Sequence, residues 1–181
     1  VFINFDPDAS PLREQMGEMN DILGEYGLER FRSAGITRYV SDWNYKFSFE
    51  TGYEAYHHAG VHAERIGDFM PPSAHTPMAF GKNWGAYRYH SPDFFAQSPF
   101  RNPFGPPPWQ TPEQLADQSK DAIFLGIYPN FISFIQPHQI SAIGVQHQSA
   151  TKNMSMTTIA VADWARERPG AEEHIAEEVQ F

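Results

Sequence analysis

Four short apolar segments in the C-terminal half, separated by tight turn signals, limit the fold more than any other feature of the chain. The segments cover residues 122–128, 131–136, 140–148 and 154–162. Pro129-Asn130, Pro137-His138 and Thr151-Lys152-Asn153 stand between them. Such residues mark turns, and consecutive strands joined by short turns pair with each other in antiparallel order. The sequence therefore predicts an antiparallel meander.

The rest of the chain supplies helices and further strands around this meander. Residues 11–31 read as one helix, with Ser10 as its cap and Pro11 in the first helical position. Residues 38–49 alternate between aromatic and polar side chains, and Gly35 is expected to turn the chain into this strand. Further strands are expected at 74–80 and 85–90, and Pro169-Gly170 opens a C-terminal helix at 171–181. Together these elements predict an α+β fold.

Composition excludes several classes of function. The 181 residues suit a single domain with a sizeable core, and the formal net charge of −9 argues against nucleic acid or anionic membranes as partners. No apolar run is long enough to span a membrane. The chain has no cysteine, so it cannot form a disulfide or ligate an iron–sulfur cluster by itself.

Residues 49–62 concentrate groups that can bind a metal. Glu50, Glu54 and the His57-His58 pair recur at helical spacing, which predicts a short helix with one acidic and imidazole face. Gly60 is expected to loosen this helix before His62. Two histidines and a carboxylate on one side of a metal suit non-haem Fe(II) and O₂ chemistry. Spacing alone leaves open whether His57 or His58 pairs with His62.

The same stretch resembles the mononuclear iron motif of the alpha subunit of Rieske non-haem iron oxygenases. The matching residues are Asn44-Tyr45-Lys46, Glu50-Thr51, Glu54, Tyr56-His57 and His62. The resemblance selects His57 and His62 as the iron ligands. Residues 125–130 are also similar to a strand of that family that ends in Tyr-Pro-Asn.

The resemblance implies a fold and a role for several residues. The fold would be a helix-grip (START/Bet v 1-like) antiparallel sheet around a C-terminal helix. Glu54 would bridge towards a cluster histidine of the neighbouring subunit and carry electron transfer. Asn44 would line the site near the iron, and Tyr56 would support His57. Residues 1–10 would be the tail of an N-terminal Rieske domain, and 11–181 a mononuclear-iron catalytic domain cut within its C-terminal helix.

The resemblance also implies cofactors and partners. These are mononuclear Fe(II), a [2Fe–2S] Rieske cluster in a part of the protein outside this sequence, a ferredoxin or reductase as electron donor, and assembly as a homotrimer in the cytoplasm. The reaction would hydroxylate or oxidatively demethylate a small aromatic or quaternary-amine substrate with O₂. The chain departs from the usual motif at Tyr45, Thr51 and Glu54, which affects the substrate class more than the iron site.

A third, carboxylate ligand is needed to complete the iron site. The candidates within the chain are Asp163, Glu172, Glu173, Glu177 and Glu178. Asp163 directly follows the last strand, and the glutamates read as the acidic first part of a helix. The third ligand is therefore predicted to lie beyond Phe181.

Two other regions invite a prediction. Residues 91–112 hold seven of the 15 prolines together with five Phe or Trp residues. This loop is therefore expected to cover a substrate pocket or to dock on a neighbouring subunit. A third alternative is that it serves as a polyproline ligand for another module. His75 and His90 have no partner nearby in sequence and are expected to be structural or pocket-lining.

Two alternative functions compete with the oxygenase. A metal-dependent hydrolase could use zinc held by two histidines and a carboxylate. A non-catalytic helix-grip domain could bind a ligand in a pocket lined by phenylalanines, without any metal.

Overall fold

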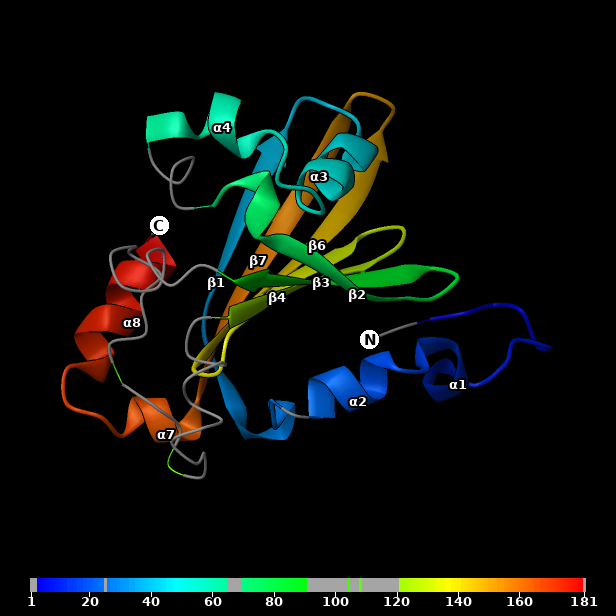
Figure 1. The fold of residues 1–181 in the computed structure, drawn as a ribbon. Helices are drawn as coiled ribbons and strands as arrows, with labels where there is room; N and C mark the ends of the chain where they lie inside the picture. Colours follow the sequence, from blue (N-terminus) through cyan, green and yellow to red (C-terminus); the bar gives the residue numbers. More distant parts are fainter. Residues whose placement is uncertain are drawn as a thin grey trace.

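One antiparallel sheet organises the part of the chain that the computed structural model describes, which is residues 3–24, 26–64, 70–90, 104, 108 and 121–180. Its seven strands follow the order β1-β7-β6-β5-β4-β3-β2 (Figure 1). The C-terminal strands are β4 (Asp121–Ile127), β5 (Phe131–Ile135), β6 (Gln139–Ser149) and β7 (Lys152–Ala162). Each pairs with the next in sequence, so the predicted meander is confirmed.

Two further strands extend the sheet beyond β4. A 3-10 turn, η3 (Pro72–Ala74), leads into β2 (His75–Phe80), which pairs with β3 (Trp84–His90). Both strands were predicted, with starts one residue away. β3 pairs with β4 although 30 residues separate them in sequence. The predicted loop at 91–112 lies outside the described residues, apart from positions 104 and 108.

The first strand differs from the prediction. β1 (Phe31–Ser41) begins earlier than expected and ends at Ser41, and the following aromatic residues belong to helix α3 (Tyr45–Thr51). The cause is Asn44, whose side chain accepts a hydrogen bond from the main chain of Lys46 and so caps a helix. Gly35 makes no turn but lies in β1 beside a bulge. The prediction of one strand over 38–49 is therefore wrong.

The N-terminal helix is also shorter than predicted. Residues 11–31 form α1 (Leu12–Met16), α2 (Met19–Gly24) and the 3-10 turn η1 (Leu28–Arg30). Gly17 ends α1 with a φ of 47°, a conformation that glycine adopts at little cost. Ser10 does not cap α1, because Pro11 holds that position and makes no side-chain capping bond.

The two faces of the sheet carry different helices. On one face, α1, α2 and η1 pack through Met19 and Leu28 against a core that includes Ile123, Leu125 and Ile135. On the other face lie α3 and α8 (Ala171–Gln180). Successive strand residues point to opposite faces, so the meander buries both of its faces at once.

Helix α8 gives the fold its grip. It follows the short helix α7 (Asp163–Arg166), which was not predicted, and it packs through Ile175 and Val179 on the end of β7. Gly35 in β1 makes this approach possible, because a Cβ there would lie 2.5 Å from Cγ1 of Val179. No helix within the described ranges is long and apolar enough to cross a membrane.

A buried histidine lies between these layers. His138, in the turn from β5 to β6, is 1% exposed, and its ring packs against the ring of Phe104. His174 of α8 interacts with it electrostatically. Neither ring nitrogen has a hydrogen-bond partner among the described residues. Burial, reinforced by His174, lowers the pKa of His138 from 6.5 to about 3. The folded protein therefore holds this imidazole neutral, while the unfolded chain protonates it below pH 6.5.

Acid should destabilise the fold through His138. Between pH 6.5 and 3 the unfolded state binds the extra proton, so stability falls as pH falls, by up to about 1.4 kcal/mol per pH unit. His138→Leu removes this contribution, and we expect its urea midpoint to change less than that of the wild type between pH 7 and pH 5. His147→Gln, at an exposed histidine, is the control and should keep the wild-type slope. Equal slopes in His138→Leu and wild type would contradict the prediction.

Candidate metal centre and substrate pocket

A buried polar network fixes α3 to the β6–β7 hairpin. The amide of Asn153, which is 0% exposed, donates to the Trp43 carbonyl oxygen at 2.9 Å. Ser48 accepts a hydrogen bond from the Trp43 indole at 2.8 Å and lies 3.4 Å from Oδ1 of Asn153. On the outer side, Asn44 donates to the Ala150 carbonyl oxygen at 2.9 Å. Buried amides joined in this way hold their neighbours in one arrangement.

The metal-binding stretch folds differently from the single helix that the spacing predicts. α3 ends at Thr51, a non-helical link follows, and a single helical turn, α4 (His58–Val61), comes next. His57 and His62 flank α4 as its N-cap and C-cap residues. Gly60 lies inside this turn, and the helix ends one residue later at Val61, so the chain leaves the helix before His62 as expected. Glu50 therefore shares no helix face with the histidines.

Glu54 orients His57 through two contacts. One carboxylate oxygen accepts a hydrogen bond from the main-chain N–H of His57 at 3.1 Å, and the other is hydrogen-bonded to Nδ1 of the His57 ring. Burial raises the pKa of the Glu54 carboxyl, but these hydrogen bonds lower it more, so the net pKa lies below the ordinary value. In the neutral form of the His57 ring, this contact assigns the proton to Nδ1 and leaves the lone pair of Nε2 available, as in a metal-ligating histidine held by a carboxylate.

The rings of His57 and His62 lie at a separation that suits a shared metal ion. Their centroids are 5.2 Å apart, with an angle of 71° between the ring planes. A metal–nitrogen bond of about 2.1 Å places each centroid about 3.2 Å from the metal, so two rings at about 90–110° are about 4.6–5.3 Å apart. This centroid separation is compatible with a shared metal ion, and the 4.6 Å separation of His57 and His58 falls in the same range.

His58 and His75 complete a cluster of four imidazoles that the sequence did not reveal. His58, the first residue of α4, is buried, and Nδ1 of its ring donates to the Met70 carbonyl oxygen at 3.0 Å. The ring centroid of His75 lies 6.1 Å from that of His58, and the His75 ring also packs against the rings of Tyr89 and Phe124. Burial lowers the pKa of both His58 and His75, so both are neutral near pH 7. His90 stands apart from this cluster, exposed at the end of β3.

No third ligand lies with the histidine pair in the described part of the chain, where no three His, Cys, Asp or Glu residues form a group that could hold a metal ion. Asp163 begins α7, at the end of the sheet opposite α4, and pairs with Arg32 at 3.3 Å (Figure 1). Glu172 and Glu173 are exposed in the first turn of α8, and Glu177 is exposed further along. The side chain of Glu178 is outside the described part.

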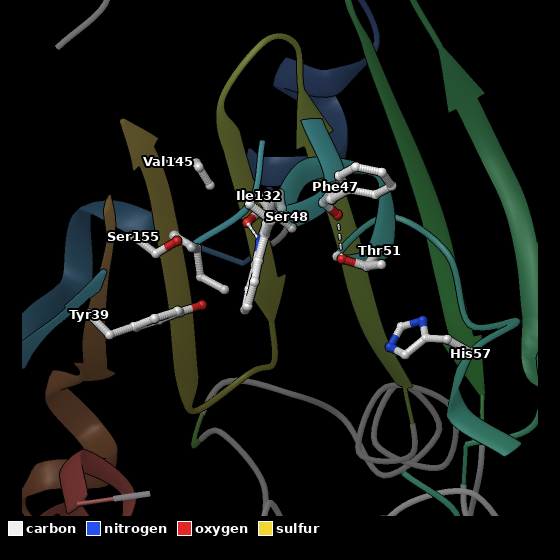
Figure 2. A pocket seen from close by; sticks show the side chains of 11 residues that line it. Tyr39, Phe47, Ser48, Thr51, His57, Ile132, Val145 and Ser155 are labelled. Atoms are coloured by element: carbon white, nitrogen blue, oxygen red, sulfur yellow. Dashed lines mark hydrogen bonds between the residues drawn. The ribbon is translucent and has the colours of Figure 1, made fainter. Parts of the chain in front are cut away.

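A cavity of about 570 Å³ opens beside His57 on the α3 face of the sheet. Figure 2 shows the ring of His57 at one end of this pocket and Tyr39 at the other. Its lining residues are Tyr39, Trp43, Phe47, Ser48, Thr51, Gly52, His57, Ile132, Ile143, Val145 and Ser155. Most of these side chains are aromatic or aliphatic, four carry hydroxyls (Tyr39, Ser48, Thr51 and Ser155), and none is a carboxylate, lysine or arginine. The pocket can hold a small apolar molecule next to the face of His57.

Two residues with predicted roles lie elsewhere. Asn44 is not among the pocket residues, and both polar atoms of its side chain serve the start of α3. Its predicted place beside the metal therefore remains a prediction. Tyr56 was expected to support His57 by packing or by hydrogen bonding; its side chain is 85% exposed, so the packing half of this expectation is wrong within this chain.

The chain matches a family model described as the ring hydroxylating alpha subunit (catalytic domain), over residues 28–181. The chain belongs to this family. No curated protein matches it. Among solved structures, it resembles the quaternary ammonium Rieske monooxygenase CntA in complex with an inhibitor, with 13% identity and a TM-score of 0.72 over 98% of this chain and 44% of that one. It also resembles naphthalene 1,2-dioxygenase from Rhodococcus sp. bound to indole, with 17% identity and a TM-score of 0.68 over 96% and 45%.

Membership of the ring-hydroxylating alpha subunits confirms the predicted family and the α+β helix-grip fold. The comparisons give no support to the hydrolase or to the non-catalytic binding domain. The chain spans less than half the length of the structures it matches. The pocket, and the proximity of His58 to His75, could not be predicted because the residues come from separate elements. His75 packs against the rings of Tyr89 and Phe124, in agreement with its expected structural place.

The polar network under α3 should be necessary for the pocket wall. Asn153→Ala leaves the Trp43 carbonyl oxygen without its donor, and we expect it to destabilise the protein by about 1–3 kcal/mol. Urea unfolding measures this change. Lys152→Ala, at the exposed neighbouring position, should stay within about 0.5 kcal/mol of wild type. Equal effects of the two substitutions would show that the network carries no special weight.

Proposed function

We propose that this chain is the catalytic part of a Rieske-type oxygenase alpha subunit, which uses Fe(II) and O₂ to hydroxylate or oxidatively demethylate a small organic substrate. The observation that carries the proposal is the Glu54-oriented His57, paired with His62 and facing an apolar pocket. Nε2 of His57 and the ring of His62 would hold the iron. When bound there, iron supplies the activation of O₂ beside the substrate.

The residues of the chain would divide the remaining tasks among themselves. Glu54 keeps Nδ1 of His57 protonated and so directs Nε2 to the metal. The aromatic and aliphatic lining of the pocket binds the substrate and excludes water from it. The side chain of Glu54 remains 38% exposed, which leaves it accessible to a neighbouring subunit. This exposure supports the proposed route of electrons from a partner's [2Fe–2S] cluster through Glu54.

The proposal includes parts that lie outside this chain. Residues 1–10 would be the tail of a Rieske domain, 11–181 the catalytic domain, and a ferredoxin or reductase would supply electrons to a cytoplasmic homotrimer. A third, carboxylate ligand would follow on α8. What supports this is the direction of α8, which runs along β1 from the α7 end towards α4 (Figure 1). Tyr39, at the end of the pocket opposite His57, lies about 13 Å beyond Gly35, and about nine helical residues after Val179 would bring α8 level with that end of the pocket.

The pocket favours an uncharged aromatic substrate over a cation. Trp43, Tyr39 and Phe47 offer ring faces, and no carboxylate lines the pocket among the described residues. Ring faces alone can also hold a quaternary ammonium group. Comparing the binding of a two-ring aromatic and a quaternary ammonium compound to the iron-loaded protein distinguishes the two classes.

Loss of either proposed ligand should remove the mononuclear iron alone. In the full-length protein, we expect His57→Ala and His62→Ala to lose mononuclear iron and hydroxylation while the cluster stays intact. Metal analysis together with the electron paramagnetic resonance of the reduced cluster measures both. His147→Ala, an exposed histidine outside the cluster, is the matched control. Full iron content in His57→Ala and His62→Ala, or zinc in place of iron in the wild type, would contradict the proposal.

Glu54 should be needed for electron delivery more than for metal binding. With Fe(II) supplied in excess, so that the mononuclear site is filled, we expect Glu54→Gln to slow product formation in a single turnover of pre-reduced protein by about 10–100-fold, because a neutral amide accepts more weakly from His57 than a carboxylate does. Glu50→Gln, at an exposed glutamate four residues earlier, is the control. A wild-type rate in Glu54→Gln would refute the role of Glu54.

A further inference from the structure

Two glycines face each other across strands β3 and β4, and the ring of Tyr53 occupies the space of their missing side chains. Gly85 pairs directly with Gly126 in the sheet. A Cβ at Gly126 would lie 2.6 Å from Cδ2 and 2.7 Å from Cε2 of Tyr53. A Cβ at Gly85 would collide with the Tyr53 hydroxyl and would lie 2.6 Å from Cδ1 of Phe80. Gly126 therefore makes room for the Tyr53 ring, and Gly85 makes room for the hydroxyl of Tyr53 and the neighbouring ring of Phe80.

Neighbouring aromatic rings hold Tyr53 in this seat over the two glycines. Phe49 of α3 stacks on it, with centroids 5.9 Å apart and planes at 18°. Tyr87 of β3 meets it edge-on at 5.1 Å and 70°. Stacked and edge-to-face pairs of this kind favour one ring orientation. Tyr53 therefore has contacts beneath it and on two sides.

The hydroxyl of Tyr53 does not explain why this residue is held. It is buried and has no hydrogen-bond partner among the described residues. Burial, with Tyr87 adding to it, raises the pKa of Tyr53. An unpartnered buried hydroxyl gives no stabilisation, so the ring supplies the useful contact.

The ring of Tyr53 belongs to the link between α3 and α4, which has little structure of its own to fix its position. Between the end of α3 at Thr51 and the start of α4 at His58 the chain has no regular structure. A single helical turn such as α4 does not hold its own geometry in water. Tyr53 immediately precedes Glu54 in sequence, and Glu54 in turn holds His57.

We propose that Tyr53, seated on Gly85 and Gly126, is a positioning residue that fixes Glu54 and His57 in the geometry of the metal centre. The proposal rests on the proposed function in taking His57 as a metal ligand. Tyr53 itself touches neither substrate nor metal. It acts by fixing the link between α3 and α4 to the sheet.

The test compares glycine and tyrosine variants of the full-length protein. Gly126→Ala places a methyl group in the seat, while Gly144→Ala is the matched control because a Cβ at Gly144 in β6 meets nothing within 4 Å. Tyr53→Phe keeps the ring and removes only the hydroxyl. One readout is the electron paramagnetic resonance of the Fe(II)–nitric oxide adduct, which reports ligand geometry. The second is hydrogen–deuterium exchange of residues 50–62 in the iron-free protein.

We expect Gly126→Ala to change the nitric oxide adduct spectrum, to weaken Fe(II) binding by about 10–100-fold and to speed exchange across residues 50–62. Gly144→Ala and Tyr53→Phe should match wild type in all three. In the Tyr53→Ala background, Gly126→Ala should add no further effect, because the ring that it displaces is already absent. If Gly126→Ala does not fold, Tyr53→Ala serves as the test variant, since it empties the seat without adding an atom.

Three results would overturn the proposal. They are a folded Gly126→Ala or Tyr53→Ala protein with wild-type spectrum and exchange, a Gly144→Ala protein as impaired as Gly126→Ala, and a Tyr53→Phe protein as impaired as Tyr53→Ala. A wild-type protein that gives no nitric oxide adduct would instead refute the proposed metal site. Exchange across residues 50–62 in the iron-free variants would still decide the role of Tyr53 in that case.

Discussion

The antiparallel pairing of β1 with β7 is the constraint on which the rest of the structure depends. It joins segments that are more than 110 residues apart, and its register ends with Ser41 opposite Asn153. Just after β1 ends, the side-chain amide of Asn153 donates a hydrogen bond to the Trp43 carbonyl oxygen. A slip of β1 by one residue would turn the side chains of β1 to the opposite face and move the Trp43 carbonyl oxygen away from this buried amide, which would leave α3 without its anchor. The strand register therefore determines where the metal centre forms.

Local patterns predicted the meander well because each of its turns is encoded next to the strands that it joins, as at Pro129-Asn130. The same reasoning failed at residues 38–49, where two periods fit one sequence. Tyr45 and Phe49 are four residues apart, which satisfies an alternating strand and a helix face equally. The cap at Asn44 decides for the helix, together with ring contacts of Tyr45 with His147 and of Phe49 with Tyr128, which are too distant in sequence for any local window.

The candidate site divides in a similar way. The pair His57 and His62, and the acidic residue before it, could be identified because one short segment carries all three. The pocket could not, since β1, α3, β5, β6 and β7 all contribute to it. The environment of His58 was hidden for the same reason, because its ring is fixed by the distant Met70 carbonyl oxygen. Residues that only tertiary packing brings together show no regular spacing in the sequence, so their proximity cannot be predicted from it.

This division has a physical consequence for the metal centre. A site built wholly from residues 54–62 would depend little on the rest of the fold, because its donors lie within nine residues of one another. A third donor carried by an extended α8 would come near His57 only once α8 packs on Gly35 and β1 pairs with β7. Metal binding would then stabilise the grip of α8 on the sheet, since the ion would bind tightly only to the folded arrangement. The helix-grip fold would in this way couple completion of the iron site to closure of the pocket beside it.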